Sequence, residues 1–204
     1  GRMMLKQILN VALAYVGVIV GAGLSSGQDL MQYFVSFGKW GILGAVILGI
    51  LNAVFGKIII TFGSYFRSND HFEVLSQIAG SITNKILDIS LIMIMIMAVY
   101  TFASQRFDFK ELETIANTIS TPMPNIWFSV LNYFSLCVMT GVSMAFVLGG
   151  SIMRIGVAEK GGTLGGFIIG IIITVTTCIL YANVKLATTV DIPMLAIAKK
   201  IHPA

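Results

Sequence analysis

The sequence is poor in charged residues, which make up 11% of its 204 positions. A soluble domain of average composition carries about 25% charged residues. Hydrophobic residues make up 56% of the chain, and its mean hydropathy is +0.90. Because so few charges cannot cover the surface of a water-soluble globule, we expect lipid to be the solvent for much of the chain.

Residues typical of catalytic and metal sites are also scarce. The chain has two histidines, His71 and His202, and neither has a second ligand at metal-site spacing. Cys137 and Cys178 both lie in apolar stretches, which indicates buried small side chains rather than a disulfide. Hydrolase, metalloprotease and phosphate-loop motifs are missing from the sequence. We therefore expect no enzyme activity, no catalytic or metal site and no cofactor.

The basic balance of the chain does not point to nucleic acid. The net charge is +4, but the basic residues form no cluster of the kind that binds phosphate backbones. They lie mostly between the apolar segments, where cations flank a membrane. The expected partners are therefore the lipid bilayer and a small-molecule solute, and no nucleic acid.

Four apolar segments reach the length of about 20 residues that a membrane span needs, and a fifth comes close to it. They cover residues 8–34, 41–66, 86–103, 126–152 and 164–186. Backbone polar groups in hydrocarbon must be paired within the segment, so each is predicted to be a helix. A shorter apolar stretch, 192–201, ends in basic residues and is predicted to lie at the membrane interface. The predicted fold class is therefore all-α, a multi-pass bundle forming one transmembrane domain over residues 1–204.

The N-terminal segment is predicted to be a retained span. Arg2 and Lys6 precede an apolar run, as in a signal peptide, but the hydrophobicity continues without a break to Val20. Basic residues close to the segment ends favour a cytoplasmic N-terminus. The predicted location is the cell membrane.

Small and polar residues interrupt the first apolar segment near its middle. Apolar residues run to Val20, the stretch GAGLSSGQD occupies 21–29, and apolar residues then return as far as Phe34. Glycine lowers helix stability, and Ser, Gln and Asp are costly in lipid. A broken helix at this depth is tolerated where it lines a cavity, and its backbone groups then serve as ligands. The residues predicted here to bind a substrate are Gly21, Ala22, Gly23, Ser25, Ser26 and Gln28.

Close helix packing is the alternative explanation of these glycines. Gly17 and Gly21, like Gly23 and Gly27, are four residues apart, the spacing of small residues at helix contacts. Packing explains the glycines but not the polar residues beside them. We therefore favour a discontinuous helix that forms a site.

The fourth apolar segment repeats the pattern more weakly, with polar and small residues between Asn132 and Ser143. Single Ser and Thr residues usually bond to their own helix, but two interrupted segments in one chain are typical of transporters. Asn132, Ser135 and Thr140 are therefore added to the predicted substrate-binding residues.

Two further patterns indicate structural roles. Lys57 and Asp88 lie within apolar segments near one membrane face. Either the two side chains form an ion pair, or Lys57 extends its ammonium group to the interface. Gly162, Gly166 and Gly170 recur at four-residue spacing, which predicts close helix packing.

Several motifs resemble those of the YkvI-like bacterial membrane proteins. They are the stretches AYVG (14–17), GAGLSSGQD (21–29), GKWG (38–41), PNIW (124–127), NY (132–133) and DIPM (191–194). The resemblance implies membership of the amino acid–polyamine–organocation superfamily and a LeuT-like inverted repeat. It implies an unwound helix 1 at 21–27, a broken helix 6 at 132–141 and a cytoplasmic N-terminus.

The resemblance also implies more spans than the five visible here. Residues 84–109 resemble the start of a third helix joined to the end of a fifth. Further helices are therefore expected between Asp88 and Tyr100, and after Ala204. The helix that would complete a cation site is not represented, and a sodium ion or a proton are the candidate coupling ions.

The function predicted is that of a secondary transporter that binds a small polar or amino-acid-like solute near mid-membrane. A half-helix starting near Gln28 would attract a carboxylate, and carbonyls around 22–25 would attract an ammonium group. The two interrupted helices are expected to face each other. The alternative is a non-transporting membrane scaffold or assembly subunit whose glycine stripes bind partner helices.

Overall fold

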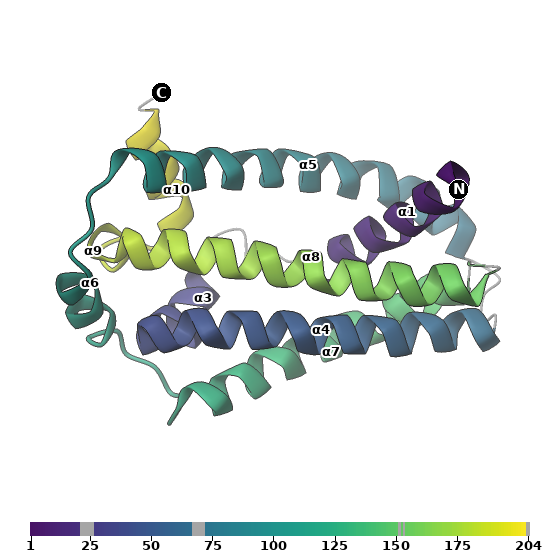
Figure 1. Ribbon diagram of the computed structural model, residues 1–204, viewed down its shortest axis with the longest axis horizontal. Helices are drawn as coiled ribbons and strands as arrows, with labels where there is room; N and C mark the ends of the chain where they lie inside the picture. The colour runs from purple at the N-terminus through teal and green to yellow at the C-terminus, as the bar shows by residue number, and fades with distance from the viewer. Residues whose placement is uncertain (21–26, 67–71, 151, 153, 203–204) are drawn as a thin grey trace. The chain divides into compact units, whose positions relative to one another are not determined.

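The computed structural model describes residues 1–20, 27–66, 72–150, 152 and 154–202, and every regular element in them is a helix. The all-α prediction is confirmed for these residues. The elements in chain order are α1 (Arg2–Ile19), α3 (Gln28–Tyr33), the 3₁₀ helix η1 (Val35–Phe37), α4 (Lys39–Phe66), α5 (Phe72–Ser104), α6 (Phe109–Ala116), α7 (Ile126–Gly150), α8 (Ile155–Ala182), α9 (Val184–Ala187) and α10 (Pro193–Ile201) (Figure 1).

Among the described residues, three helices are long and apolar enough to cross a membrane. They are Arg2–Ile19, Lys39–Tyr65 and Ile155–Ala182, and α7 adds a fourth if its two bent parts form one span. The predicted segment 86–103 lies in α5, where Asp88–Ser104 is apolar but shorter. The stretch predicted at 192–201 is α10, with Lys199 and Lys200 in its last turn.

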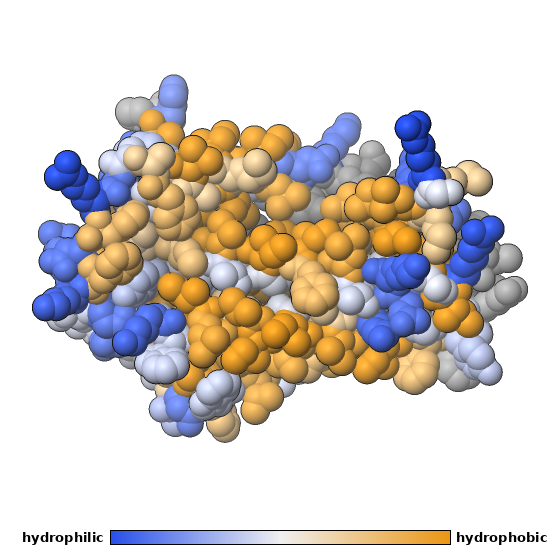
Figure 2. Space-filling view, viewed as in Figure 1, coloured by the Kyte–Doolittle hydropathy of each residue, from blue (hydrophilic) through white to orange (hydrophobic). Residues whose placement is uncertain are grey.

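Helix α4 shows why lipid is the expected solvent. Six large apolar side chains at three- or four-residue spacing are exposed along it: Leu43, Val46, Ile50, Val54, Ile58 and Phe62. Figure 2 shows apolar side chains along the long helices and hydrophilic ones gathered toward their ends. A continuous apolar stripe of this length matches hydrocarbon rather than water.

The chain divides into two compact units. Unit 1 consists of Gly1–Val20, Leu48–Asp88 and Phe134–Ile171, and unit 2 of Gly21–Ile47, Ile89–Tyr133 and Ile172–Ala204. Helices α4, α5, α7 and α8 each contribute to both units. A single transmembrane domain over 1–204 therefore stays a prediction.

In unit 1, glycines allow α4 and α8 to approach at backbone distance. A Cβ atom added to Gly49 would lie 2.5 Å from the Cα of Gly170. One added to Gly162 would overlap the carbonyl of Gly56, and one added to Gly166 would overlap the backbone of Ala53. The predicted packing role of the stripe Gly162, Gly166 and Gly170 is confirmed.

Helix α1 packs in the same unit against both of these helices. The buried Tyr15 hydroxyl donates to the carbonyl of Asn52, at 2.9 Å, in the middle of α4. Toward α8, a Cβ on Gly165 would lie 2.8 Å from the Ala12 carbonyl oxygen, so only a glycine admits α1 there. The contacts of Tyr15 and Ala12 thus fix the depth of α1 within unit 1.

Lys57 pairs with a residue other than Asp88, which the sequence offered as one of two alternatives. Its Nζ lies 3.3 Å from Oε1 of Glu159 on α8, and Asp88 is an exposed residue of α5. The α4–α8 glycine contact at Gly56 and Gly162 brings Glu159, three residues before Gly162, to the same level as Lys57. Both side chains remain about half exposed, 52% and 46%.

A double-mutant cycle on this pair should give a small positive coupling. We expect Lys57→Met and Glu159→Gln singly to lower the thermal midpoint slightly, and the double variant to lose less than their sum. An exposed pair of this kind is worth up to about 1 kcal/mol, because solvent screens the charges. The measurement is thermal unfolding of the detergent-solubilised protein, and strictly additive losses would contradict the pairing.

Candidate functional site

The first apolar segment is interrupted in the structure as well as in the sequence. Helix α1 ends at Ile19, and its C-cap Val20 has an extended backbone, with φ −72° and ψ 113°. Gly27, before α3, has the left-handed φ of 82°. The predicted site residues Gly21, Ala22, Gly23, Ser25 and Ser26 lie outside the described residues.

Gly27 sets the start of α3 in unit 2. A Cβ there would lie 3.0 Å from Cγ of Met194 and 3.2 Å from Cδ2 of Leu180, in a backbone conformation that side chains disfavour. Glycine is therefore required both by the turn and by the close approach of α8 and α10. The helix that follows has six residues, Gln28–Tyr33, which is shorter than the half-helix that the sequence predicts up to Phe34.

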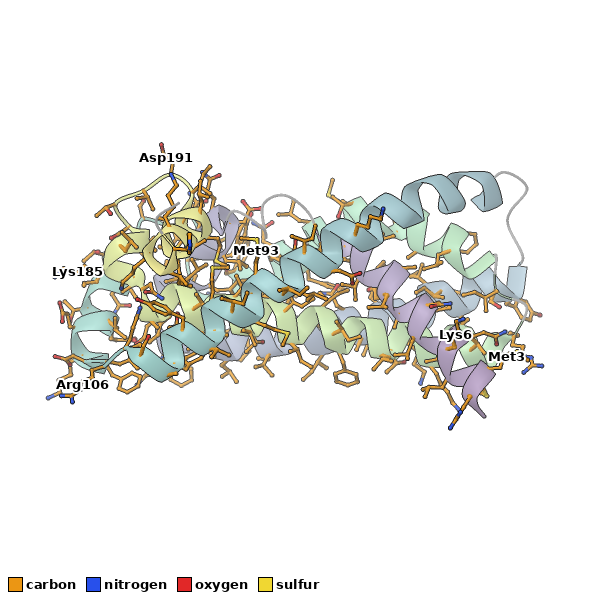
Figure 3. All side chains as sticks on the ribbon, turned by 90° about the horizontal axis from the view of Figure 1, so that it is seen from above. Met3, Lys6, Met93, Arg106, Lys185 and Asp191 are labelled. Atoms are coloured by element: carbon orange, nitrogen blue, oxygen red, sulfur yellow. The ribbon has the colours of Figure 1, made fainter. Side chains whose placement is uncertain are left out.

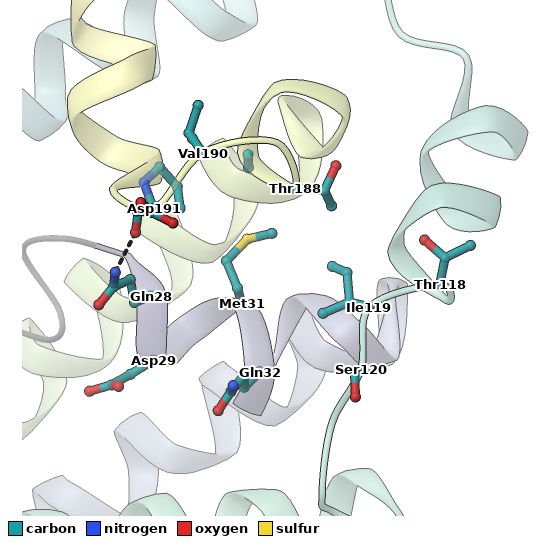
Figure 4. A pocket seen from close by; sticks show the side chains of 12 residues that line it. Gln28, Asp29, Met31, Gln32, Thr118, Ile119, Ser120, Thr188, Val190 and Asp191 are labelled. Carbon is teal, nitrogen blue, oxygen red and sulfur yellow. Dashed lines mark hydrogen bonds between the residues drawn. The ribbon is translucent and has the colours of Figure 1, made fainter.

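A cavity of about 660 Å³ opens beside α3 within unit 2 (Figure 4). Three segments line it: α3, the stretch after α6, and the stretch from α9 to the start of α10. The lining residues are Gln28, Asp29, Met31, Gln32, Thr118, Ile119, Ser120, Ala187, Thr188, Val190, Asp191 and Pro193.

The lining is polar and carries acidic but no basic side chains. It presents the carboxylates of Asp29 and Asp191, the amides of Gln28 and Gln32, and three hydroxyl groups. The Gln28 side chain donates from Nε2 to the carbonyl of Asp191, which ties α3 to the start of α10 (Figure 4). Such a surface can hydrogen-bond a small polar solute and favours one with a positively charged group.

Of the predicted site residues that the structure describes, only Gln28 lines this cavity. Asn132, also in unit 2, donates from Nδ2 to Sδ of Met123 at 3.3 Å. Ser135 and Thr140 belong to unit 1 and are exposed, and the Thr140 hydroxyl donates to the carbonyl of Leu136 at 2.9 Å. Thr140 thus bonds within its own helix, as Ser and Thr in spans commonly do, and Asn132 bonds to the loop before α7.

The second predicted interruption lies further along the chain than the sequence indicates. Helix α7 is helical from Ile126 to Gly150, including the stretch 132–141 predicted to open. It bends by 53° between Ile126–Val142 and Met144–Gly150. A hydroxyl that bonds back to its own helix, as Thr140 does, permits bending without breaking the ladder.

Both parts of the first segment contact α7, each within its own unit. In unit 1, a Cβ on Gly141 would overlap the side chain of Ile19 at the end of α1. In unit 2, the ring of Tyr133 lies 5.2 Å from Tyr33 and 5.4 Å from Phe34, and the Ser129 hydroxyl donates to the carbonyl of Tyr33. Helix α7 therefore contacts the ends of both α1 and α3.

Sequence reasoning missed most of the cavity. Gln32 lies one turn after Gln28, so a polar stripe along α3 could have indicated it. Asp191 drew attention only within the motif DIPM, and Thr188 and Ser120 stand in stretches without a distinctive pattern. Only the fold brings these segments together.

In the part of the chain that the structure describes, no group of three or more His, Cys, Asp or Glu residues is arranged to hold a metal ion. Cys137 and Cys178 are not joined to each other or to another cysteine.

Comparison with known proteins gives one similarity. No protein-family model and no solved structure matches the chain. It is 22% identical over 87 residues to the uncharacterized membrane protein YkvI of Bacillus subtilis (strain 168). These 87 residues make up 43% of this chain and 25% of that protein. This chain is a helical membrane protein. It resembles a YkvI-like protein and spans about a quarter of the length of that relative.

Proposed function

We propose that this membrane protein acts as a secondary transporter and binds a small polar, amino-acid-like solute. The observation that carries the proposal is the polar cavity beside α3, where the first apolar segment is interrupted. Interrupted helices that border a polar cavity are typical of secondary transporters, because freed backbone groups then face the solute.

The chemistry of the lining supports an amino-acid-like solute. The carboxylates of Asp29 and Asp191 suit an ammonium group, while the amides of Gln28 and Gln32 suit a carboxylate or another acceptor. A volume of about 660 Å³ lies within the range of small-molecule sites. Because α3 has only six residues, side chains rather than a helix dipole carry this argument.

The same proposal includes the finer features that the family resemblance implies. They are a LeuT-like fold of the amino acid–polyamine–organocation superfamily, a cell-membrane location with a cytoplasmic N-terminus, and coupling to sodium or protons. The proposal involves no catalysis and no cofactor.

The competing scaffold function would use glycine stripes to bind partner helices. The stripe Gly162, Gly166 and Gly170 instead contacts α4 of the same chain. A stripe that is occupied within its own unit is not available to a partner, so this observation favours transport over assembly.

A screen of solute uptake tests the proposal. The protein would be reconstituted into sealed vesicles of phosphatidylethanolamine and phosphatidylglycerol, and radiolabelled amino acids and amines offered with and without a sodium or proton gradient. We expect saturable uptake of at least one solute above protein-free vesicles. Uptake equal to that of protein-free vesicles for every solute would support the scaffold function.

A further inference from the structure

One wall of the cavity belongs to the segment between Gln105 and Asn125, and hydrogen bonds fix this segment at both ends. At its start, Gln105 donates from Nε2 to Oδ1 of the buried Asn183, at 3.1 Å, which fixes the end of α5 to the end of α8. At its far end, Oδ1 of Asn125 accepts from the backbone N–H of Phe128, at 2.9 Å, and caps α7. We call residues 106–124, between these anchors, the strap; α6 is its one helix.

Glu113 holds the middle of the strap. Its Oε2 accepts two hydrogen bonds, from the backbone N–H of Lys39 at 3.1 Å and from the hydroxyl of Tyr181 at 2.6 Å. Lys39 is the first residue of α4, and Tyr181 belongs to the last turn of α8. One carboxylate thus ties the strap to the ends of two long helices.

The start of α4 is shaped to receive this carboxylate. Gly38 has a φ of 63°, and a Cβ there would overlap the carboxyl group of Glu113. The first N–H groups of a helix have no partner within the helix and attract an anion. Glycine at position 38 therefore provides both the turn and the space for the Glu113 side chain.

The second contact of α6 is weaker. Glu111 lies 3.8 Å from Lys185, and both side chains are mostly exposed, 55% and 81%. Figure 3 shows Lys185 and Arg106 at the edge of the molecule, pointing outward. An exposed ion pair at this distance contributes little, so the hydrogen bonds of Glu113 are the stronger polar attachment of α6.

The cavity wall is continuous with α6. The N–H groups of Thr118 and Ile119 donate back to the carbonyls of Ile115 and Ala116, at 3.1 Å each. Thr118, Ile119 and Ser120 line the cavity. Any movement of α6 therefore carries this wall with it.

We propose that Glu113 is a latch that positions the cavity wall, and that its release lets the strap move away and open the cavity. The latch consists of Glu113, Gly38, the N–H of Lys39 and the hydroxyl of Tyr181. Its role in gating a solute rests on the proposed function, but its effect on the strap does not. Glu113 is a positioning residue, because it is not among the residues that line the cavity.

Hydrogen–deuterium exchange of the detergent-solubilised protein tests the latch without a solute. In Glu113→Ala, amide exchange over residues 109–120 should rise about tenfold or more, because two hydrogen bonds to a charged group are lost. Glu113→Gln, which keeps an acceptor but no charge, should give a smaller rise. The matched control Glu111→Gln, on the same helix, should change exchange little.

Two further variants keep the proposal falsifiable if Glu113→Ala does not fold. Tyr181→Phe removes one donor, and Gly38→Ala displaces the carboxylate while leaving Glu113 in place. Each should increase amide exchange more in residues 109–120 than in α4 and α8. Unchanged exchange in the strap, or a rise equal in all helices, would overturn the latch. A protein that takes up no solute yet shows the local rise would refute transport and leave the latch standing.

Discussion

Leucine in place of Gly166 should prevent the stable packing of α4 against α8. A Cβ at this position already overlaps the backbone of Ala53 and Asn52, so no side-chain rotation relieves the clash. Overpacking a core costs about 1–3 kcal/mol where side chains can adjust, and more where backbones must separate. We therefore expect a loss of at least about 3 kcal/mol, which corresponds to roughly 10 °C in thermal midpoint.

Gly156→Leu is the matched control for this prediction. Gly156 lies in the first turn of the same helix and has no atom within 4 Å of its added Cβ. Leucine has a higher helix propensity than glycine, and the gain at the interior position 166 is no smaller than at 156, so a greater loss of stability at Gly166 reflects packing. The readouts are the monodisperse fraction on size-exclusion chromatography and the thermal midpoint in detergent. Equal behaviour of the two variants would contradict the close α4–α8 contact.

Replacing Asn183 with leucine should destabilise unit 2 almost as strongly as Gly166→Leu destabilises unit 1. The side chain is 5% exposed and makes three hydrogen bonds. Its Nδ2 donates to Oγ1 of Thr101 at 3.3 Å and to the carbonyl of Ile179 at 2.9 Å, and its Oδ1 accepts from Gln105. Orphaning a buried polar group costs about 1–3 kcal/mol, so we expect a total loss of about 2–4 kcal/mol.

Thr101→Val separates the contribution of one bond in this group. Thr101 is fully buried on α5, and removing its hydroxyl alone should cost about 1 kcal/mol. In the Asn183→Leu background the same change should cost less or nothing, because the hydroxyl has already lost this partner. Thermal unfolding of the four proteins gives the coupling, and additive losses would show that the two side chains do not interact.

Local sequence patterns predicted the helices better than the contacts between helices. The apolar runs identified the long helices, and the stretch after Val20 identified the end of α1, because burial in lipid and helix-breaking residues act through neighbouring positions. The spacing of Gly162, Gly166 and Gly170 predicted a contact but not that α4 makes it. Asp88 was considered as a partner of Lys57 and Glu159 was not, since the glycine crossing that aligns α4 with α8 is not visible in either segment alone.

The candidate site was predictable only at α3. Gln28 stood out because a polar residue in an apolar run has a high cost in lipid. Asp191, Thr188 and Ser120 come from connecting stretches, where polar residues are ordinary and carry no signal. Glu113 was equally inconspicuous, because its role depends on Gly38 and Tyr181, which are distant in sequence. The polar residues of α7 suggested an opened helix, but a back-bonded hydroxyl such as Thr140 leaves the helix intact.

Solute uptake by two neighbouring threonine variants is the most direct test of the proposed cavity. Thr188 lines the cavity and Thr189 does not, although both are exposed and both hydroxyls bond to a carbonyl three residues earlier. With the solute found in the uptake screen, Thr188→Trp should lower the initial rate at least about tenfold by filling the cavity, while Thr189→Trp should retain most of it. Equal rates for the two variants, measured in vesicles with equal amounts of folded protein, would place the solute elsewhere.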